Sequence, residues 1–218
     1  MHDLVNGLHV TLRKYRRGAD SAHYDFVGSL YPALGVSLPA AIGMARVRYP
    51  TGRGDFLGTT LCISNDTRVK VNARVNGILS MGQAEAVFVP EPKAVCHEAK
   101  KPQDMYVWPG IVLMARCKSG DPKVTNGIRY LVSGIPDGEF ELTPIDDNDE
   151  ATGKSESMDA DELSAKMRLT HAITDFPSQA RTIHNGLRLT DTDKARFSIR
   201  HLIVGLGRAP VGGNVEVQ

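Results

Sequence analysis

The chain has little of what builds metal centres, disulfide frameworks or membrane spans. It has three cysteines in 218 residues, and Cys62, Cys96 and Cys117 have none of the spacings of zinc ligands. An odd, small number of cysteines fits a reducing compartment. No apolar run approaches the roughly 20 residues of a membrane span, and the first residues form no signal core. We expect an intracellular protein with no membrane partner and no metal site. The sequence does not distinguish between nucleus, cytoplasm and viral factory.

The sequence also lacks the glycine-rich loop that cradles nucleotide phosphates. No G-x-x-x-x-G-K-S/T motif occurs, and the nearest imitation, Gly153-Lys154-Ser155, has Asn148 where the motif needs glycine. We therefore expect this chain alone to bind neither ATP nor Mg²⁺. The G-x-S-x-G elbow of α/β hydrolases is missing too, which excludes that class of enzyme.

Charge is distributed very unevenly. The formal net charge is +1, yet the segment from Asp137 to Glu162 holds eleven acidic residues and one lysine. The rest of the chain has 25 basic and 14 acidic residues, a charge of +11. A protein region with this positive charge can bind a polyanion, although basic residues are also common on ordinary protein surfaces. We expect residues 146–162 to form an acidic, flexible loop.

Hydrophobic periodicity predicts alternating helices and strands in the first half. Helices are expected over 21–30 with Ser21 as N-cap, around 40–47 within a Pro- and Gly-rich linker, and from Asp66 onward. Asn65 or Asp66 can cap the third helix, and 59–64 is typical of a short buried strand. The apolar residues expected on the buried face of the third helix are Val71, Val75, Ile78 and Leu79.

Residues 107–145 have the pattern of antiparallel strands. Three strands over 111–117, 128–135 and 139–145 are separated by Gly, Pro and Asp turns. This indicates a small antiparallel barrel or meander inserted in an α/β domain.

The last fifty residues return to the α/β pattern. They predict a strand over 167–174, a turn and short helix over 175–183, a strand over 186–191 and a helix within 193–210. In this last helix the apolar stripe consists of Ile199, Leu202, Ile203 and Leu206. A closing strand is expected at Val215–Val217.

Arg208 lies off that stripe, just before the helix breaks at Pro210. A guanidinium at a helix end can donate two hydrogen bonds to a phosphate held by another domain. A lone arginine of this kind is otherwise a surface residue that pairs with Glu or Asp.

Together these segments resemble superfamily 1 DNA helicases of the Pif/RecD type. LTHAITDFPSQARTI followed by FSIRHLIVGLGRAP resembles their last two motifs, roughly aromatic-A-x-T-x-H-K-S-Q-G-x-T and a helix with V-A-L-S-R. Residues 7–32, 59–79 and 107–135 resemble three earlier family segments in the same order. These four segments in register cover most of the chain.

The resemblance implies the C-terminal part of a helicase motor. The expected fold is α/β: a RecA-like, P-loop NTPase-type second domain, with a parallel sheet, flanking helices and an inserted small antiparallel β-barrel. Residues 1–58 would be the tail of the first motor domain and a linker. Residues 59–106 and 163–218 would form the second domain, 107–145 the barrel and 146–162 the acidic loop.

In a complete enzyme, ATP and Mg²⁺ would bind between the two motor domains. The resemblance implies that Arg208 is the arginine finger, that Gln179 lies near the nucleotide, and that Arg17 senses the terminal phosphate. The adjacent Arg16 fits the last role nearly as well.

The resemblance also implies a track for single-stranded DNA at strand ends. Its candidates are Ser64, Asn65 and Arg68 after one strand and Thr174 after another, with His171 as a packing or stacking residue. Capping of the following helix is an equal explanation for Ser64 and Asn65.

The chain departs from the family pattern at the DNA-facing motif. Phe176-Pro177 replaces the family's His-Lys, and Ala180 replaces its glycine. These changes remove polar contacts and leave a second hypothesis open, a noncatalytic nucleic-acid- or protein-binding module derived from a helicase. In either case ATPase activity of this chain alone is expected to be negligible.

Overall fold

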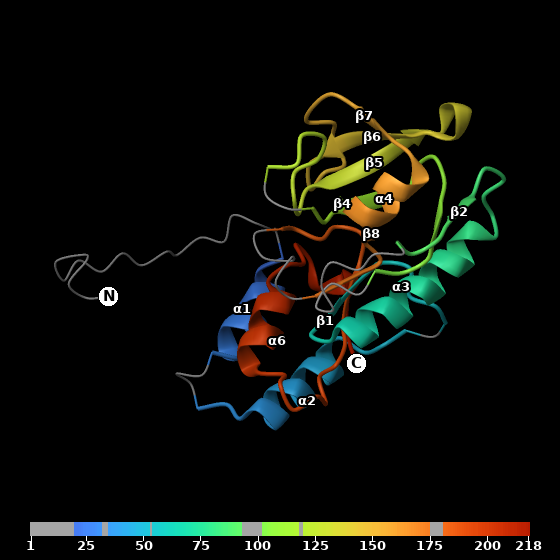
Figure 1. Cartoon of the computed structure of the whole chain (residues 1–218). Helices are drawn as coiled ribbons and strands as arrows, with labels where there is room; N and C mark the ends of the chain where they lie inside the picture. The colour runs from blue at the N-terminus through green and yellow to red at the C-terminus, as the bar shows by residue number, and fades with distance from the viewer. Residues whose placement is uncertain (1–19, 32–34, 53, 93–101, 118–119, 175–180) are drawn as a thin grey trace.

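Two sheets organise the molecule, a parallel one and an antiparallel one (Figure 1). The computed structural model describes residues 20–31, 35–52, 54–92, 102–117, 120–174 and 181–218. The described helices are α1 (Ser21–Ser29), α2 (Leu38–Arg48), α3 (Asn65–Ser80), α4 (Ala160–Lys166) and α6 (Ile199–Leu206). Short 3-10 turns lie at Pro136–Gly138 and Gly212–Asn214.

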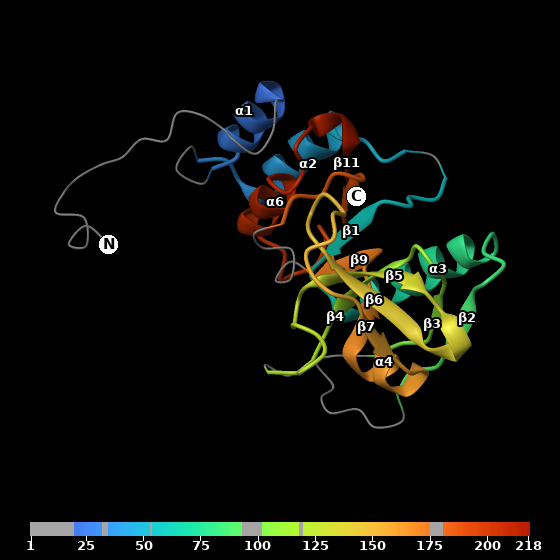
Figure 2. The ribbon, with the colours of Figure 1, turned by 90° about the horizontal axis from the view of Figure 1, so that it is seen from above.

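The parallel sheet has the strand order β11-β10-β1-β9. Its strands are β1 (Thr59–Cys62), β9 (Ala172–Thr174), β10 (Leu187–Leu189) and β11 (Val215–Val217). Helices α1, α2 and α6 lie on one face and α3 on the other (Figures 1 and 2). The closing strand at Val215–Val217 is confirmed, as is the buried strand after residue 58.

Helix α6 packs on the sheet through its predicted stripe. Leu202 and Leu206 are fully buried in the core of the parallel sheet. A Cβ atom at Gly205 would lie 2.5 Å from Leu189 Cδ2, so glycine lets helix and strand approach this closely without displacing the Leu189 side chain. This explains a glycine in V-G-L-G-R.

The antiparallel sheet has the order β7-β6-β5-β4-β8 and forms a half-barrel. Its strands are β4 (Val112–Ala115), β5 (Arg129–Gly134), β6 (Phe140–Ile145), β7 (Glu156–Met158) and β8 (Met167–Leu169). A hairpin of β2 (Val87–Val89) and β3 (Met105–Val107), which the sequence analysis did not predict, contributes to the same core.

The structure differs from the sequence-based expectation around the acidic segment. Residues expected as flexible loop contain β7, which pairs with β6, and the start of α4. The strand predicted over 167–174 is two strands, because β8 pairs with β4 whereas β9 pairs with β1. One continuous apolar run therefore serves both sheets.

One helix N-cap differs from the prediction and one is decided among the predicted alternatives. Asp20, not Ser21, caps α1 by accepting from His23 N at 2.9 Å. Of the candidates Ser64, Asn65 and Asp66, it is Ser64 that caps α3, by accepting from Thr67 N at 3.2 Å.

The buried face of α3 is mostly polar, and of the predicted apolar stripe only Val75 is fully buried. Arg68, Asn72 and Asn76 are the other buried residues of this helix. Asn72 accepts from Ala172 N at 2.6 Å and donates to Ala172 O at 3.1 Å. Asn76 makes the same pair with Tyr106, at 2.7 and 2.9 Å. The two amides therefore tie α3 to the backbones of β9 and β3.

Candidate functional site

The carboxyl edge of the parallel sheet is organised by a buried aspartate. Asp191 follows β10, is 6% exposed and has φ 62°. Its Oδ2 accepts from Ile63 N at 3.2 Å and Ser64 N at 3.0 Å, and its Oδ1 accepts from Thr67 Oγ1 at 2.6 Å. Asp191 thus fixes the end of β1 and the first turn of α3. Asp191 was not among the predicted site residues, although an aspartate two residues after an apolar strand was a usable signal.

The predicted DNA contacts Ser64, Asn65 and Arg68 lie together at this edge. The Ser64 hydroxyl is engaged in capping α3, and Asn65 Oδ1 accepts from Arg68 Nε at 3.3 Å. Arg68 is 2% exposed and also donates to Gln103 Oε1 at 3.5 Å. Burial lowers the pKa of the Arg68 guanidinium. These contacts give all three residues a structural role, beside which the predicted DNA role stays a prediction.

Thr174 ends β9 at the same edge. It is opposite Cys62 in the register of β9 and β1, and its hydroxyl has no hydrogen-bond partner among the described residues. The side chain is partly exposed. It remains available to donate to a phosphate oxygen.

Arg208 lies at the opposite, amino edge of the sheet. Its carbonyl accepts from Ile183 N at 2.8 Å, and residue 183 precedes β10. Because α6 connects two parallel strands, its C-terminus must lie where those strands begin. Ser64 and Thr174 are therefore separated from Arg208 by the length of the strands, on the order of 10 Å.

The Arg208 guanidinium is bonded to its own domain in this conformation. Its Nε donates to Val204 O at 3.2 Å and its Nη1 to Arg181 O at 3.5 Å. The side chain is half-buried. The predicted presentation to a phosphate stays a prediction, and it would require these two bonds to be exchanged.

The N-terminal helix docks beside Arg208. His23 in α1 is fully buried and contacts Leu206 O at 3.1 Å, and Tyr24 donates to Ala209 O at 3.4 Å. Asp20 accepts from Gly212 N at 2.9 Å. The segment that the resemblance assigns to the first motor domain therefore contacts the end of α6 and the following turn, next to the predicted finger.

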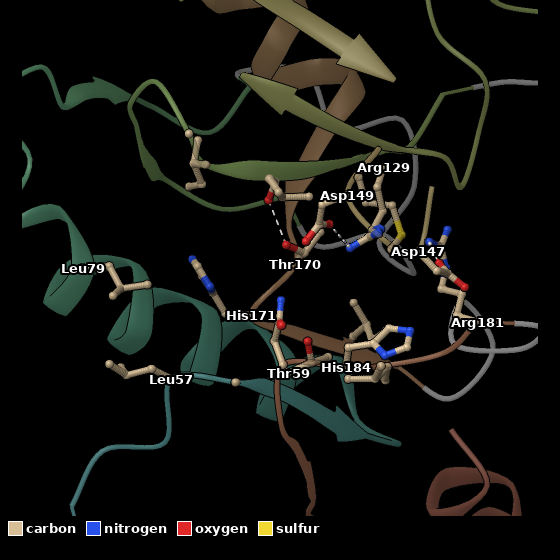
Figure 3. A pocket seen from close by; sticks show the side chains of 18 of the residues that line it. Leu57, Thr59, Leu79, Arg129, Asp147, Asp149, Thr170, His171, Arg181 and His184 are labelled. Carbon is tan, nitrogen blue, oxygen red and sulfur yellow. Dashed lines mark hydrogen bonds and ion pairs between the residues drawn. The ribbon is translucent and has the colours of Figure 1, made fainter. Parts of the chain in front are cut away.

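A cavity of about 270 Å³ separates the amino edge of the parallel sheet from the half-barrel (Figure 3). Apolar side chains such as Leu57 and Leu79 line one part of it. Across from them, Arg129 pairs with Asp149 at 3.0 Å and Arg181 with Asp147 at 3.7 Å. These ion pairs compensate both arginine charges in the cavity wall.

His171 lines this cavity rather than the carboxyl edge (Figure 3). Its Nε2 is buried without a hydrogen-bond partner among the described residues. Burial lowers the pKa of His171 to about 4, so the ring is neutral at pH 7. The structure places it three residues before Thr174 but at the other end of β9, which favours packing over a shared DNA contact.

Two predicted residues, Arg17 and Gln179, lie outside the described residues, as do Arg16, Phe176-Pro177 and Ala180. Within the described ranges, no group of three or more His, Cys, Asp or Glu side chains could hold a metal ion. No helix in that same part of the chain is long and apolar enough to cross a bilayer.

Comparison with solved structures places the chain among known folds. Pif1 helicase from Candida albicans superposes with a TM-score of 0.61 at 17% identity, over 95% of this chain and 55% of that one. Bacteroides Pif1 bound to ssDNA gives 0.60 at 14% identity, over 94% and 50%. Bacteroides Pif1 in complex with ADP-AlF3 and ssDNA gives 0.58 at 15% identity, over 96% and 51%.

These similarities show that the chain has the fold of about half of a Pif1 helicase. The chain spans about half the length of the solved proteins that it matches. No family model and no curated protein sequence matches it.

Proposed function

We propose that this chain is the RecA-like second motor domain of a Pif1-like DNA helicase, with the half-barrel as its inserted β-barrel. It would act with a first motor domain that carries the nucleotide loop. The fold similarity over 94–96% of the chain, to proteins of which two are bound to ssDNA, carries this proposal. Single-stranded DNA would run along the carboxyl edge near Ser64 and Thr174.

The separation of the two edges supports this division of labour. DNA at the carboxyl edge and ATP with Mg²⁺ at the amino edge would not compete for space. The backbone next to Arg208 contacts α1, where the first motor domain would continue, so a phosphate bound by that domain would be within reach of the guanidinium. Closing of the two domains on ATP would let Arg208 exchange backbone carbonyls for phosphate oxygens.

The role of Arg208 as an arginine finger can be tested after joining this chain to a first motor domain. That domain should be one that hydrolyses ATP only when this chain is attached. Arg208→Ala should reduce turnover on the order of 10³-fold while the affinity for ATP changes little. Arg200→Ala, an exposed arginine on the same helix, is the matched control. An unchanged rate for Arg208→Ala would refute the finger. The present chain alone should show negligible ATPase activity.

DNA binding is tested separately by fluorescence anisotropy with a labelled single strand. Binding that weakens steeply as salt rises would support the DNA role. An absence of binding at about 50 mM salt would contradict it.

One observation favours a second candidate, a noncatalytic nucleic-acid-binding module. Arg208 is already bonded to Val204 O and Arg181 O, an arrangement that closes the end of α6 without any nucleotide. In that case Arg208→Ala would lower stability and leave DNA binding unchanged, and addition of a first motor domain would produce no ATPase activity.

A further inference from the structure

One face of the half-barrel is turned toward the parallel sheet and carries cationic side chains. In β4, Leu113 and Ala115 belong to the half-barrel core, whereas Met114 belongs to the core of the parallel sheet. Side chains alternate along a strand, so Arg116 falls on the same face as Met114. Arg116 therefore lies between the two sheets, half-buried.

Arg168 in β8 shares that face with Arg116. It is paired with Met114 in the register of β4 and β8, and Arg116 N donates to Lys166 O at 2.6 Å one step further along. Arg116 and Arg168 are thus diagonal neighbours, with Cα atoms about 7–8 Å apart. Two guanidinium groups at this spacing can contact one anion.

Neither guanidinium has an acidic partner in the described part of the chain. Arg168 Nη2 donates to Met114 Sδ at 3.0 Å, and its buried Nε has no hydrogen-bond partner among the residues that the structure describes. Arg116 makes no side-chain hydrogen bond or ion pair with a described residue. By contrast, Arg129 and Arg181 in the neighbouring cavity both face aspartates.

Two further groups increase the positive potential at this place. Burial, with a smaller contribution from the Arg68 charge, lowers the pKa of Arg116 and of Arg168 to about 10. Gln103 Nε2 is a buried donor with no acceptor in the described ranges, and the Oε1 of the same side chain accepts from Arg68 at 3.5 Å. Burying a charge without a counterion costs free energy. A negatively charged ligand would compensate the arginine charges and therefore bind strongly.

We propose that Arg116 and Arg168 bind a backbone phosphate of single-stranded DNA, extending the track from the carboxyl edge onto the half-barrel. This inference rests on the proposed function. A strand phosphate fits better than a free nucleotide, because Arg68 connects this pair to the carboxyl edge whereas Arg208 lies at the amino edge. Both arginines keep part of their surface exposed, and arginine matches the geometry of phosphate oxygens.

The test uses the full chain and a labelled oligothymidylate, with the dissociation constant measured by anisotropy over a range of salt concentrations. The double variant Arg116→Met and Arg168→Met should bind about 100-fold more weakly at low salt. Its salt slope should be shallower by roughly 1.4, about 0.7 for each lost contact. Arg74→Met, an exposed arginine on α3 with 72% of its side chain accessible, should change affinity less than about twofold.

A second readout separates a binding role from a structural one. The DNA-free double variant should melt at the same temperature as the wild type or higher, because methionine removes an uncompensated charge and keeps most of the volume. A lower melting temperature would mean that the arginines hold the sheets together, and would overturn the proposal.

Further outcomes assign any failure to its cause. An unchanged affinity and salt slope in the double variant, while Thr174→Val weakens binding, would overturn this inference alone. Displacement of the oligonucleotide from the wild-type chain by millimolar ATP would overturn the assignment to a strand phosphate. A wild-type chain that binds no oligonucleotide would overturn the proposed DNA role and, with it, this inference.

Discussion

Two sets of buried polar side chains differ in how many of their hydrogen-bonding groups and charges have partners. On α3, Asn72 and Asn76 each exchange two hydrogen bonds with one residue of a strand. On the half-barrel, Arg116 and Arg168 have charge and donors but no described acceptor of opposite charge. A satisfied buried group holds a fold together, whereas an unsatisfied one marks a place where a ligand would gain most. The contrast separates scaffold from candidate site within one layer of the molecule.

The largest effect is expected when a side-chain amide that makes both of its hydrogen bonds to a strand is removed. Asn72→Ala would leave the Ala172 N–H and C=O groups at the sheet edge without partners, so stability should fall by about 4 kcal/mol. Urea unfolding gives the change. Asn126→Ala, at an exposed turn position, is the control and should be near neutral. A loss below about 1 kcal/mol for Asn72→Ala would show that the amide is dispensable.

The next effect concerns His171, whose buried Nε2 lacks a described partner. Burial lowers its pKa from 6.5 to about 4. Above pH 6.5, His171 is neutral in both the folded and the unfolded chain, so it does not reduce the free energy of unfolding. As the pH falls toward 4, the unfolded chain takes up a proton that the folded chain does not, so stability decreases by about 3 kcal/mol over the full window.

This pH dependence is measured by urea unfolding between pH 7.5 and 5. His171→Gln should flatten the slope strongly but not fully, because burial also lowers the pKa of His23. Equal slopes in the variant and the wild type would show that His171 is protonated without penalty in the folded chain.

A satisfied carboxylate should show a smaller effect. Asp191→Asn keeps the left-handed backbone conformation, which asparagine tolerates, but weakens three hydrogen bonds at the ends of β1 and α3. We expect a loss of about 2 kcal/mol in thermal or urea unfolding. Asp193→Asn, exposed two residues later, serves as control. Equal stability of the two variants would remove Asp191 from the scaffold.

The smallest effect has the opposite sign. Arg116→Met should leave stability unchanged or raise it by about 1 kcal/mol, because an uncompensated charge is replaced by an apolar side chain of similar length. Urea unfolding of the DNA-free chain measures it. A destabilisation above about 1 kcal/mol would show that Arg116 stabilises the fold, as Asn72 and Asn76 do. The difference between the two sets of side chains would then disappear.

Patterns within one element predicted much of the fold. The stripe of α6, the closing strand β11 and the three central half-barrel strands follow from spacing along the chain. The polar face of α3 did not, because Asn72 and Asn76 become favourable only when backbone groups of β9 and β3 lie opposite them. The division of 167–174 into β8 and β9 escaped prediction for a similar reason, since the same apolar residues suit either sheet.

The candidate site was predictable only in part. Ser64 and Thr174 were found because polar residues follow apolar strands, and the structure places both at the carboxyl edge. Asp191 fits the same rule and was missed. Arg116 and Arg168 were not found, since isolated arginines in strands carry no local signal of whether an acidic partner lies nearby.

The sequence by itself determined where helices and strands form, the α/β pattern with its antiparallel insertion, and the resemblance to Pif/RecD helicases, because these depend on the local order of residues. The tertiary structure alone decided which polar groups are matched. It turned Arg208 onto the carbonyls of Val204 and Arg181 and gave Asp191 three donors. It also left Arg168 without a carboxylate among the described residues. Compensation of charge depends on neighbours brought together by folding, and spacing along a chain does not encode it.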